Sequence, residues 1–551
     1  MDNTLLLLLK LLIVTTIVSL IAWIVYLFYC KCRQRRRDEG GPLNRPLNSA
    51  SAEPHRVSGG EFPPFQPPGE EGEEHNEDRG RTVPTGPLRG SLAPTRAPSQ
   101  FLQIKQKAED TPLGAAGDPV VFSDYDPLGT TAGSVGTPPD MNAARSGNVV
   151  MLSYNTSVLL STDGASTYSV LNPTTVFPSG PTNDSSGNPL DNGLCCDQQL
   201  QYVPQIDRFI WLMQFCGTGP GGCLNGINKV RIASASPQDI INSNGTSWTY
   251  WDLFSSTFSL GTTTMDYPDL SVGDNFLYFS ADAVGTGLLV VRIPLKEIRD
   301  SQTINMGYTT PSDSAVAYGG HISQNTGDEV FWAGHNNNSQ MRVFSMKEGS
   351  GQYFWRDINI NSWPNGIISS IAQDGTTDWL QFLGQNFPRN AVLGATRRNN
   401  NEVWFAWTAS QGGGFPRAHV QVVEINTTNY SVISQWQIWN NDYAFAYPSL
   451  CTNANSEVGI SLAWGGNQNF GNHAVGILGD FVVWYPELSD TAITRWGDYV
   501  SVRRNTPKTL MFDASGYAVF KQTPPATGIR FDPYYIQFGR DSVVNGGSKI
   551  G

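Results

Sequence analysis

The sequence is poor in charged residues, and the charge that it carries is mostly acidic. Charged side chains make up 15% of the 551 residues, and the formal net charge is −12. Nucleic-acid binding rewards clustered lysine and arginine, so this balance argues against a nucleic acid as partner. Low charge, combined with 56 glycines and 11% aromatic residues, favours an all-β globular body over a helical one.

Motifs of the common catalytic and cofactor-binding folds are also missing. The sequence has no HExxH metal motif, no phosphate-binding Gly-Lys-Ser/Thr loop, no GxSxG elbow and no dinucleotide fingerprint. The histidines of the C-terminal body are isolated from one another and from the cysteines: His321, His335, His419 and His473. We therefore expect no cofactor and no metal site. Calcium at the acidic loop of Asp124 and Asp126 is the alternative, although the ligand spacing departs from that of an EF-hand.

What the sequence does have is one phrase that recurs roughly every 60 residues. Each copy starts with a small or acidic residue and continues with alternating apolar and aromatic residues. The copies start at Gly147, Asp207, Asp274, Asp328, Asn401, Ser456 and Ser515. Such alternation predicts β-strands, and its recurrence predicts four-stranded blades around an axis. We predict a seven-bladed β-propeller over residues 143–540, with six or eight blades as alternatives, followed by a flexible tail over 541–551.

The N-terminus predicts a membrane anchor. The run from Leu5 to Tyr29 is almost wholly apolar and long enough to cross a bilayer, so we assign residues 1–37 to a single-pass transmembrane helix with a basic flank. A cleaved signal peptide is the alternative, but no small-residue cleavage site is obvious. Cys30 and Cys32 at the end of the span are candidates for lipidation, or else small residues at an interface.

Residues 38–142 are rich in proline, glycine, glutamate and arginine and contain few large apolar residues. Such a segment cannot bury enough apolar surface to offset the entropy of ordering its backbone. We therefore predict a disordered linker, extended by its prolines, that holds the propeller away from the membrane.

The propeller region contains five cysteines, so at least one thiol is free or paired between chains. Cys216 and Cys223 flank the glycine-rich turn GTGPGG and could close a disulfide loop. The adjacent Cys195 and Cys196 are not expected to pair with each other. Cys451 completes the set.

Several phrases resemble those of a known propeller family. The segment SVLLSTDGASTYSVLNP is similar to a degenerate Asp-box, the hairpin turn of sialidase-like propellers. Its turn residues are Ser161, Asp163, Gly164 and Tyr168. The phrases that begin at Met265, Ala444 and Arg495 resemble the DYP, YPS and WGDY segments of BNR-like propellers of the sialidase superfamily. The resemblance covers roughly residues 147–539, and it implies the propeller fold and a structural role for the turn.

The same phrases supply the candidate binding site. Each places Tyr-Pro or Asp-Tyr just before a strand, where proline is tolerated because it lacks an N–H donor. In a propeller, residues at such a position face the axial channel or its mouth. The ligand-binding candidates are Tyr267, Asp269, Tyr447, Ser449, Trp496, Asp498, Tyr499 and Arg503. The alternative for each aromatic residue is packing between blades, and for each aspartate it is capping of backbone N–H groups.

Sialidase chemistry is not expected, even though the fold resembles that of sialidases. Those enzymes hold a carboxylate with three arginines, and glycosidases in general need a pair of carboxylates at a suitable separation. Arg292 lies in an Arg-Ile-Pro motif, but the motif ends a mid-chain blade instead of preceding the first Asp-box. Glu329, Glu402 and Glu457 belong to the recurring strand starts, which points to a role in the turns.

We interpret the chain as a membrane-anchored propeller that binds a glycan or protein ligand at the mouth of its channel. A glycoside hydrolase or lyase and a protein-docking scaffold are the alternatives. Carboxylates converging on the mouth with an arginine cluster would favour the enzyme, and an aromatic, amide-lined mouth would favour binding. The basic flank places the propeller in the cytoplasm, whereas the type of domain favours the outside, so the side of the membrane stays open.

Overall fold

The computed structural model describes residues 43–58, 100–106, 118–127, 138–220, 222–385, 390–480, 482–522 and 528–545. The predicted anchor, with Cys30 and Cys32, lies outside these residues. None of the helices that the structure describes is long and apolar enough to span a membrane.

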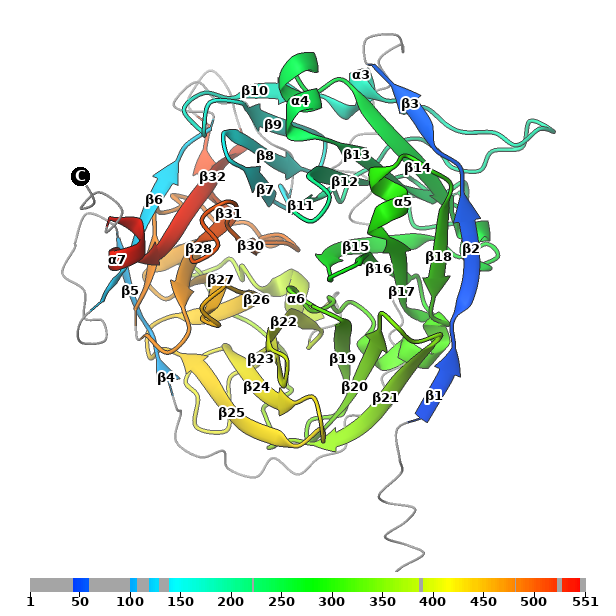
Figure 1. The fold of residues 1–551 in the computed structure, drawn as a ribbon. Helices are drawn as coiled ribbons and strands as arrows, with labels where there is room; N and C mark the ends of the chain where they lie inside the picture. Colours follow the sequence, from blue (N-terminus) through cyan, green and yellow to red (C-terminus); the bar gives the residue numbers. More distant parts are fainter. Residues whose placement is uncertain are drawn as a thin grey trace, which may run out of the picture.

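Seven sheets stand around a common axis, which confirms the predicted seven-bladed β-propeller (Figure 1). The innermost strands of six blades are β7 (Asn142–Ser146), β11 (Gln199–Val203), β15 (Met265–Val272), β22 (Val392–Asn399), β26 (Ala444–Thr452) and β30 (Ser501–Arg504). In the fourth blade, residues 321–327 fill this position without forming a regular strand. There Gln324 bridges to Thr396 of the fifth blade, and Gly327 bridges to Gly273 of the third.

The recurring phrase forms the second strand of every blade. These strands are β8 (Val149–Tyr154), β12 (Arg208–Gln214), β16 (Phe276–Ala283), β19 (Glu329–Asn337), β23 (Glu402–Ala409), β27 (Val458–Gly466) and β31 (Phe512–Lys521). Almost all of their residues are buried, on both faces, because each blade packs against two neighbouring blades. The apolar core therefore lies between the blades, and large aromatic residues fit both faces of these strands.

The outer parts of the blades complete the sheets. The third strands are β9 (Ser157–Ser161), β13 (Lys229–Ala235), β17 (Gly287–Pro294), β20 (Gln340–Lys347), β24 (His419–Asn426), β28 (Asn469–Ile477) and β32 (Ile529–Arg540). The fourth strands of the first six blades are β10 (Ser169–Leu171), β14 (Trp248–Phe254), β18 (Ile304–Tyr308), β25 (Val432–Trp439) and β29 (Val482–Tyr485), with β21 (Gln352–Asn359) in the fourth blade. Short helices lie in the connections: α3 (Pro173–Val176), α4 (Pro237–Ser243), α5 (Leu295–Arg299), α6 (Gln381–Gln385) and α7 (Asp541–Val544). Helix α7 occupies the start of the tail that was predicted to be flexible.

Strands from the N-terminal region form a strap around the rim, drawn in blue and light blue in Figure 1. The strap consists of β1 (Leu43–Pro46) on β21, β2 (Asn48–Ala52) on β18, β3 (His55–Val57) on β14, β4 (Gln100–Phe101) on β25, β5 (Gln103–Gln106) on β29 and β6 (Val120–Tyr125) on β32. It adds a strand to six of the seven sheets. The last of these, β6, is the fourth strand of the seventh blade, and the chain runs from it into the first.

The prediction of a disordered linker over 38–142 is therefore wrong for the strap. The argument from composition assumed that an ordered segment must bury its own apolar side chains. The strap instead pairs its backbone with sheet edges that are already formed, as in β2, where Ala50 pairs with Met306 and every residue of β2 has a partner in β18. The described strap residues add few large buried side chains, those of Val57 in β3, Leu102 between β4 and β5, and Val120 and Phe122 in β6. Backbone pairing places little demand on composition.

β2 is the edge strand of its sheet, so every second backbone amide of β2 pairs with β18. We expect these paired amides to exchange with solvent deuterium at least about tenfold more slowly than the amide of the exposed Ser185. Exchange followed by mass spectrometry at single-residue resolution on the whole chain measures this. Equal exchange at β2 and at Ser185 would contradict the pairing of the strap.

Candidate binding site

The inner strands define two ends of the channel. At the N-terminal end, where these strands start, lie most of the residues predicted from sequence. At the C-terminal end, where they finish, lies an open pocket. The two ends differ in what fills them, and that difference decides which end can take a ligand.

Tyr267 and Tyr447 hold equivalent positions at the N-terminal end. Each precedes a proline inside an innermost strand, and each has a positive φ, 53° for Tyr267 and 52° for Tyr447. The register shifts by one residue at both places, between Asp266 and Asp269 and again between Ala446 and Ser449. Proline cannot donate to the ladder, so the strand bulges around it and resumes afterwards.

The ring of Tyr267 packs in a stack that joins three blades. Its centroid lies 4.7 Å from that of Tyr499 and 5.0 Å from that of His321, and the last two rings are 5.6 Å apart and nearly parallel. The Tyr267 hydroxyl donates to the Asp498 carbonyl oxygen at 3.0 Å, and the Tyr499 hydroxyl donates to the Pro268 carbonyl oxygen at 3.1 Å. Both tyrosines are buried, so they pack the blades together instead of facing a ligand.

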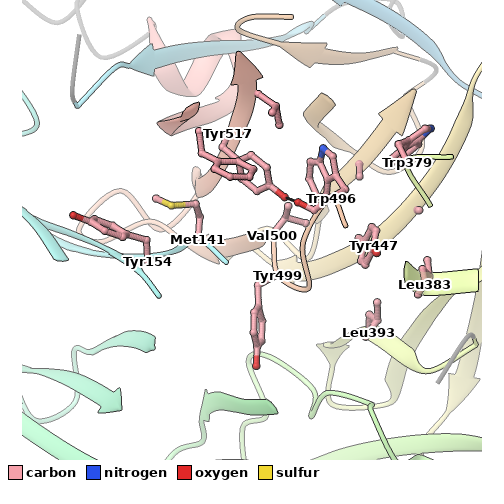
Figure 2. Close-up of a cluster of buried hydrophobic side chains, with 14 of the residues drawn as sticks. Met141, Tyr154, Trp379, Leu383, Leu393, Tyr447, Trp496, Tyr499, Val500 and Tyr517 are labelled. Atoms are coloured by element: carbon pink, nitrogen blue, oxygen red, sulfur yellow. Dashed lines mark hydrogen bonds between the residues drawn. The ribbon is translucent and has the colours of Figure 1, made fainter. Parts of the chain in front are cut away.

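Trp496 is the centre of a second aromatic group at this end. Figure 2 shows its indole between Tyr517 and Tyr447, with Trp379 beyond. Its ring centroid lies 4.6 Å from that of Tyr517, 5.7 Å from that of Tyr447 and 6.2 Å from that of Trp379. The Tyr517 hydroxyl also donates to the Trp496 carbonyl oxygen.

The connection between the fourth and fifth blades covers this group. Its buried apolar side chains belong to the same core cluster as Trp496: Ile368, Ala372, Trp379, Leu380, Phe382 and Leu383. The guanidinium of Arg495 lies 4.0 Å from the centroid of the Phe382 ring and ties α6 to the loop of Trp496. The N-terminal end of the channel is therefore filled by the chain itself.

The carboxylates at this end hold the backbone. Asp140 Oδ1 accepts from the amide of Asp498 at 2.8 Å and from that of Tyr499 at 3.3 Å, and its Oδ2 accepts from Asn155 Nδ2 at 3.1 Å. Asp498 Oδ2 pairs with Arg495 Nη2 at 2.9 Å. Burial, reinforced by the charge of Asp498, raises the pKa of Asp140 to about 7. Asp140, which was not among the predicted residues, thus caps backbone N–H groups, whereas the predicted Asp498 pairs with Arg495.

The raised pKa of Asp140 predicts a pH dependence of stability. The pKa of an unfolded aspartate is about 3.9, so between about pH 4 and 7 the folded state holds a proton that the unfolded state has lost. The contribution of Asp140 to the free energy of unfolding should therefore fall by at least about 1 kcal/mol as the pH rises through this window, and this loss should stay constant above it. Burial lowers the pKa of His335, His419 and His473 to about 3, so these groups change the stability in the opposite direction over the same range. Urea unfolding at pH 4.5 and 8, compared between the native chain and a variant that lacks the carboxyl group, isolates the contribution of Asp140.

Between pH 4.5 and 8, the change in the free energy of unfolding of Asp140→Asn should be more positive than that of the native chain by at least about 1 kcal/mol, because asparagine does not titrate. Asp207→Asn is the matched control, since Asp207 also has a positive φ but is exposed. If the native chain and Asp140→Asn change by the same amount between the two pH values, the raised pKa of Asp140 is contradicted.

The C-terminal end of the channel holds a pocket of about 210 Å³. Residues from five blades line it: Gln201, Tyr202, Pro204, Gln205, Val272, Gly273, Asp274, Gln324, Asn325, Gly327, Cys451, Arg503, Arg504 and Thr506. Amide side chains recur in this lining, together with one phenol and two guanidinium groups, and Asp274 is the one carboxylate. Because the lining comes from blades on opposite sides of the ring, the pocket lies on the axis.

Not every polar atom of the residues that line this pocket has a hydrogen-bond partner among the described residues. Arg503 Nη2 lies 3.7 Å from Asp269 Oδ1, and its Nη1 donates to the carbonyl oxygen of Val502 at 3.2 Å. Neither Arg503 Nε nor Gln201 Oε1 has a hydrogen-bond partner in the part of the chain that the structure describes. Asn325 Nδ2 donates to the sulfur of Cys451, a free and buried cysteine whose pKa is raised by burial.

The structure thus divides the predicted site residues. Arg503 lines the axial pocket, with Asp269 beside it. The others lie at the filled N-terminal end: Tyr267, Tyr447, Trp496, Asp498 and Tyr499. Sequence reasoning missed Gln201, Gln324 and Asn325, which follow no motif. They could have been predicted from their position, because Gln201 lies near the C-terminal end of an inner strand, and Gln324 and Asn325 lie near the C-terminal end of residues 321–327, which replace the inner strand of the fourth blade.

Contacts at the predicted structural turn agree with its role. Ser161 Oγ accepts from the amide of Ala165 at 3.0 Å, and Asp163 Oδ1 accepts from the amide of Thr167 at 2.9 Å. Hydrogen bonds from the Thr167 hydroxyl, the Thr167 amide and the Ser161 hydroxyl to the carboxylate of Asp163 lower the pKa of Asp163 to about 2, and the Thr167 hydroxyl contributes most. Gly164 has a φ of 81°, and Tyr168 packs against the core.

Two disulfides lie beside the second blade. Cys216 pairs with Cys223, as predicted, but Cys195 pairs with Cys196, so the expectation that these neighbours do not pair is wrong. The sulfur atoms of Cys195, Cys216 and Cys223 lie within 4.8 Å of one another, the one metal-type grouping among the described residues, and all three are in disulfides.

Two further predictions concern Arg292 and the acidic loop. Arg292 lies in β17, a third strand, and its Nη1 donates to the carbonyl oxygen of Lys347 at 2.7 Å, which ties two blades together. Asp124 lies in β6 of the strap, and neither it nor Asp126 belongs to a ligand grouping in the described part of the chain.

The chain is similar to known proteins in structure but not in sequence. No known family and no curated protein matches the chain by sequence. A Trypanosoma rangeli sialidase in complex with 2,3-difluorosialic acid is 10% identical, with a TM-score of 0.32, over 68% of this chain and 57% of its own. A Penicillium chrysogenum alpha-L-arabinanase complexed with arabinobiose is 9% identical, with a TM-score of 0.32, over 78% of this chain and 98% of its own. The catalytic domain of a Coprinopsis cinerea alpha-L-arabinofuranosidase is 10% identical, with a TM-score of 0.27, over 65% and 94%. No activity of this chain follows from these matches.

Proposed function

We propose that this protein is a recognition module that binds a glycan in the axial pocket at the C-terminal end of its channel. The observation that carries the proposal is the lining of that pocket. Amides, a phenol and two guanidinium groups from five blades converge on a small volume, and one carboxylate accompanies them. Sugar hydroxyls both donate and accept hydrogen bonds, so such a lining suits them.

The same lining argues against glycoside hydrolysis. That reaction uses two carboxyl groups, one on each side of the scissile bond. The axial pocket offers Asp274 alone, since Asp269 is occupied beside Arg503 and does not line it. The carboxylates next to this pocket, those of Asp328 and Glu329, are paired with Arg397 and Lys347. At the other end of the channel the carboxylates of Asp140 and Asp498 are buried and engaged with the backbone and with Arg495.

A glycan array tests the proposal, with calorimetry on whatever binds. Gln201→Ala should weaken binding about 5- to 10-fold, the effect of one hydrogen bond of about 1 kcal/mol. Gln352→Ala is the matched control, because Gln352 is exposed on β21 at the rim. Equal effects of the two substitutions would mean that the glycan binds outside the axial pocket. Absence of any glycan binding would favour a role in docking a protein. Release of free sugar from a bound glycan would favour the enzyme.

We further propose that residues 1–37 anchor this module in a membrane. If they do, the strap changes the geometry that the sequence suggested. Strand β1 begins at Leu43, so the chain between residue 37 and the rim of the fourth blade spans at most roughly 20 Å. The propeller is then held close to the membrane instead of far from it. Protease added to intact cells that carry a C-terminal tag, with a permeabilised control, reports on which side the propeller lies.

A further inference from the structure

A second pocket adjoins the axial one on the same face of the propeller. It has a volume of about 720 Å³ and lies between the fourth and fifth blades. Its lining residues are Asp274, Gly327, Asp328, Glu329, Ser345, Lys347, Phe354, Arg397, Asn400, Thr427, Thr428 and Tyr430. Asp274 and Gly327 line both pockets, so the two cavities meet at these residues.

The ridge between the pockets, formed by Asp274 and residues 326–328, is firmly held. The amide of Asp274 donates to the carbonyl oxygen of Gly327 at 2.9 Å. Arg397 Nη1 donates to the carbonyl oxygen of Thr326 and to Asp328 Oδ1, both at 2.6 Å. Gly327 has a φ of 58°, and a Cβ there would lie 3.2 Å from Arg397 Nη1. A side chain at this position would be strained, and glycine keeps the ridge free of one.

The charges of the second pocket nearly balance. Arg397 is paired with Asp328 at 2.6 Å, and Lys347 lies 3.9 Å from Glu329. Across both pockets the cationic side chains are those of Arg397, Lys347, Arg503 and Arg504, and the carboxylates are those of Asp274, Asp328 and Glu329, with Asp269 beside Arg503. The charges therefore balance over the two pockets, and a polyanion gains no net attraction. Hydroxyl groups and the rings of Phe354 and Tyr430 supply the rest of the lining, which suits uncharged, hydroxyl-rich units.

The two volumes set the length of the ligand. Pockets that hold a whole small molecule measure about 300–1,000 Å³, so the axial pocket of about 210 Å³ takes one small unit, and the second pocket has room for more. We propose that the two pockets form one continuous site for an uncharged oligosaccharide of at least two residues. The terminal residue enters the axial pocket, and the residues that follow lie between the fourth and fifth blades. This inference rests on the function proposed above.

The test is a library of neutral mono- to tetrasaccharides, with heparin as a polyanionic probe, presented to the whole chain and to two variants. The protein is produced without N-glycosylation, because sequons at Asn426 and Asn429 adjoin the second pocket. Thr428→Arg places a long side chain in that pocket from an exposed position. Thr262→Arg is the matched control, an exposed threonine outside both pocket linings.

We expect affinity to rise at least about tenfold from a monosaccharide to the trisaccharide that contains it. Thr428→Arg should abolish that rise and leave monosaccharide binding unchanged, whereas Thr262→Arg should alter neither. Equal affinity at all lengths, or equal effects of the two variants, would overturn the continuous site while leaving the proposed function intact. Tighter binding of heparin than of every neutral sugar would overturn the uncharged class. Failure of all sugars to bind would remove the proposed function itself.

Discussion

Replacing Trp496 with alanine is expected to lower the free energy of unfolding by about 3–5 kcal/mol. The indole is 1% exposed and packs against three aromatic rings from different parts of the chain, those of Tyr517, Tyr447 and Trp379. Its neighbours cannot collapse into the space that it leaves. Tyr447 is fixed by its bulge, and Gly471, where a Cβ would lie 2.6 Å from the Trp496 ring, has no side chain to fill the space. The cost therefore combines lost burial with a persistent cavity.

Chemical denaturation of the whole chain, followed by tryptophan fluorescence and circular dichroism, measures this loss. Trp355→Ala is the control, because Trp355 lies half-buried on β21 near the rim, and its removal should cost less than about 2 kcal/mol. The Trp496 variant should also keep its ligand affinity wherever it remains folded, because the axial pocket lies at the other end of the channel. Equal destabilisation by the two substitutions would mean that the filled end is no more tightly packed than the rim.

The blades were predictable because the second strand of each blade has the same environment. A second strand lies between two other strands and two neighbouring blades, so it must be apolar on both faces. Trp211 and Trp332, fully buried in β12 and β19, show how strictly this holds. That demand leaves a pattern that the sequence displays seven times. The strands of the strap were not predicted because they lie at the sheet edges, where they are held by backbone pairing and not by the burial of their side chains.

The site was predictable only in part, for a different reason. Trp-Gly-Asp-Tyr precedes the inner strand β30 as predicted, whereas Tyr-Pro lies at a bulge within β15 and β26 instead of before them. No local pattern shows which end of a channel is open. That depends on residues 360–385, which fold over the N-terminal end through Trp379 and Leu380. Their presence lengthens the interval between two repeats, which indicates an insertion without telling where it packs. Arg503 was predicted because it follows a recognisable motif. Gln201 and Asn325 follow no motif, and they come together only when the seven blades have closed into a ring.

Removing the carboxylate of Asp252 should be as costly as removing Trp496. Asp252 Oδ1 and Oδ2 accept from Arg231 Nε at 2.6 Å and from Arg231 Nη2 at 2.8 Å, and Oδ2 also accepts from Lys229 Nζ at 3.0 Å. The side chains of Lys229 and Arg231 are 0% and 2% exposed. Asp252→Asn would leave two buried cations with Asp191 as their one carboxylate, 3.3 Å from Lys229. Breaking such a pair costs about 3–5 kcal/mol.

Asp300→Asn is the matched control, because Asp300 pairs with Arg299 at the surface and should cost less than about 1 kcal/mol. The pH dependence separates charge from packing. Burial alone would raise the pKa of Asp252, but Arg231 and Lys229 outweigh it and hold the pKa at about 2, below the unfolded value of about 3.9. Its stabilisation is therefore complete above about pH 4 and is lost as the pH falls toward 2. The native chain should lose more stability across that window than Asp252→Asn does. Parallel losses would show that the carboxylate acts through its shape and hydrogen bonds and not through its charge.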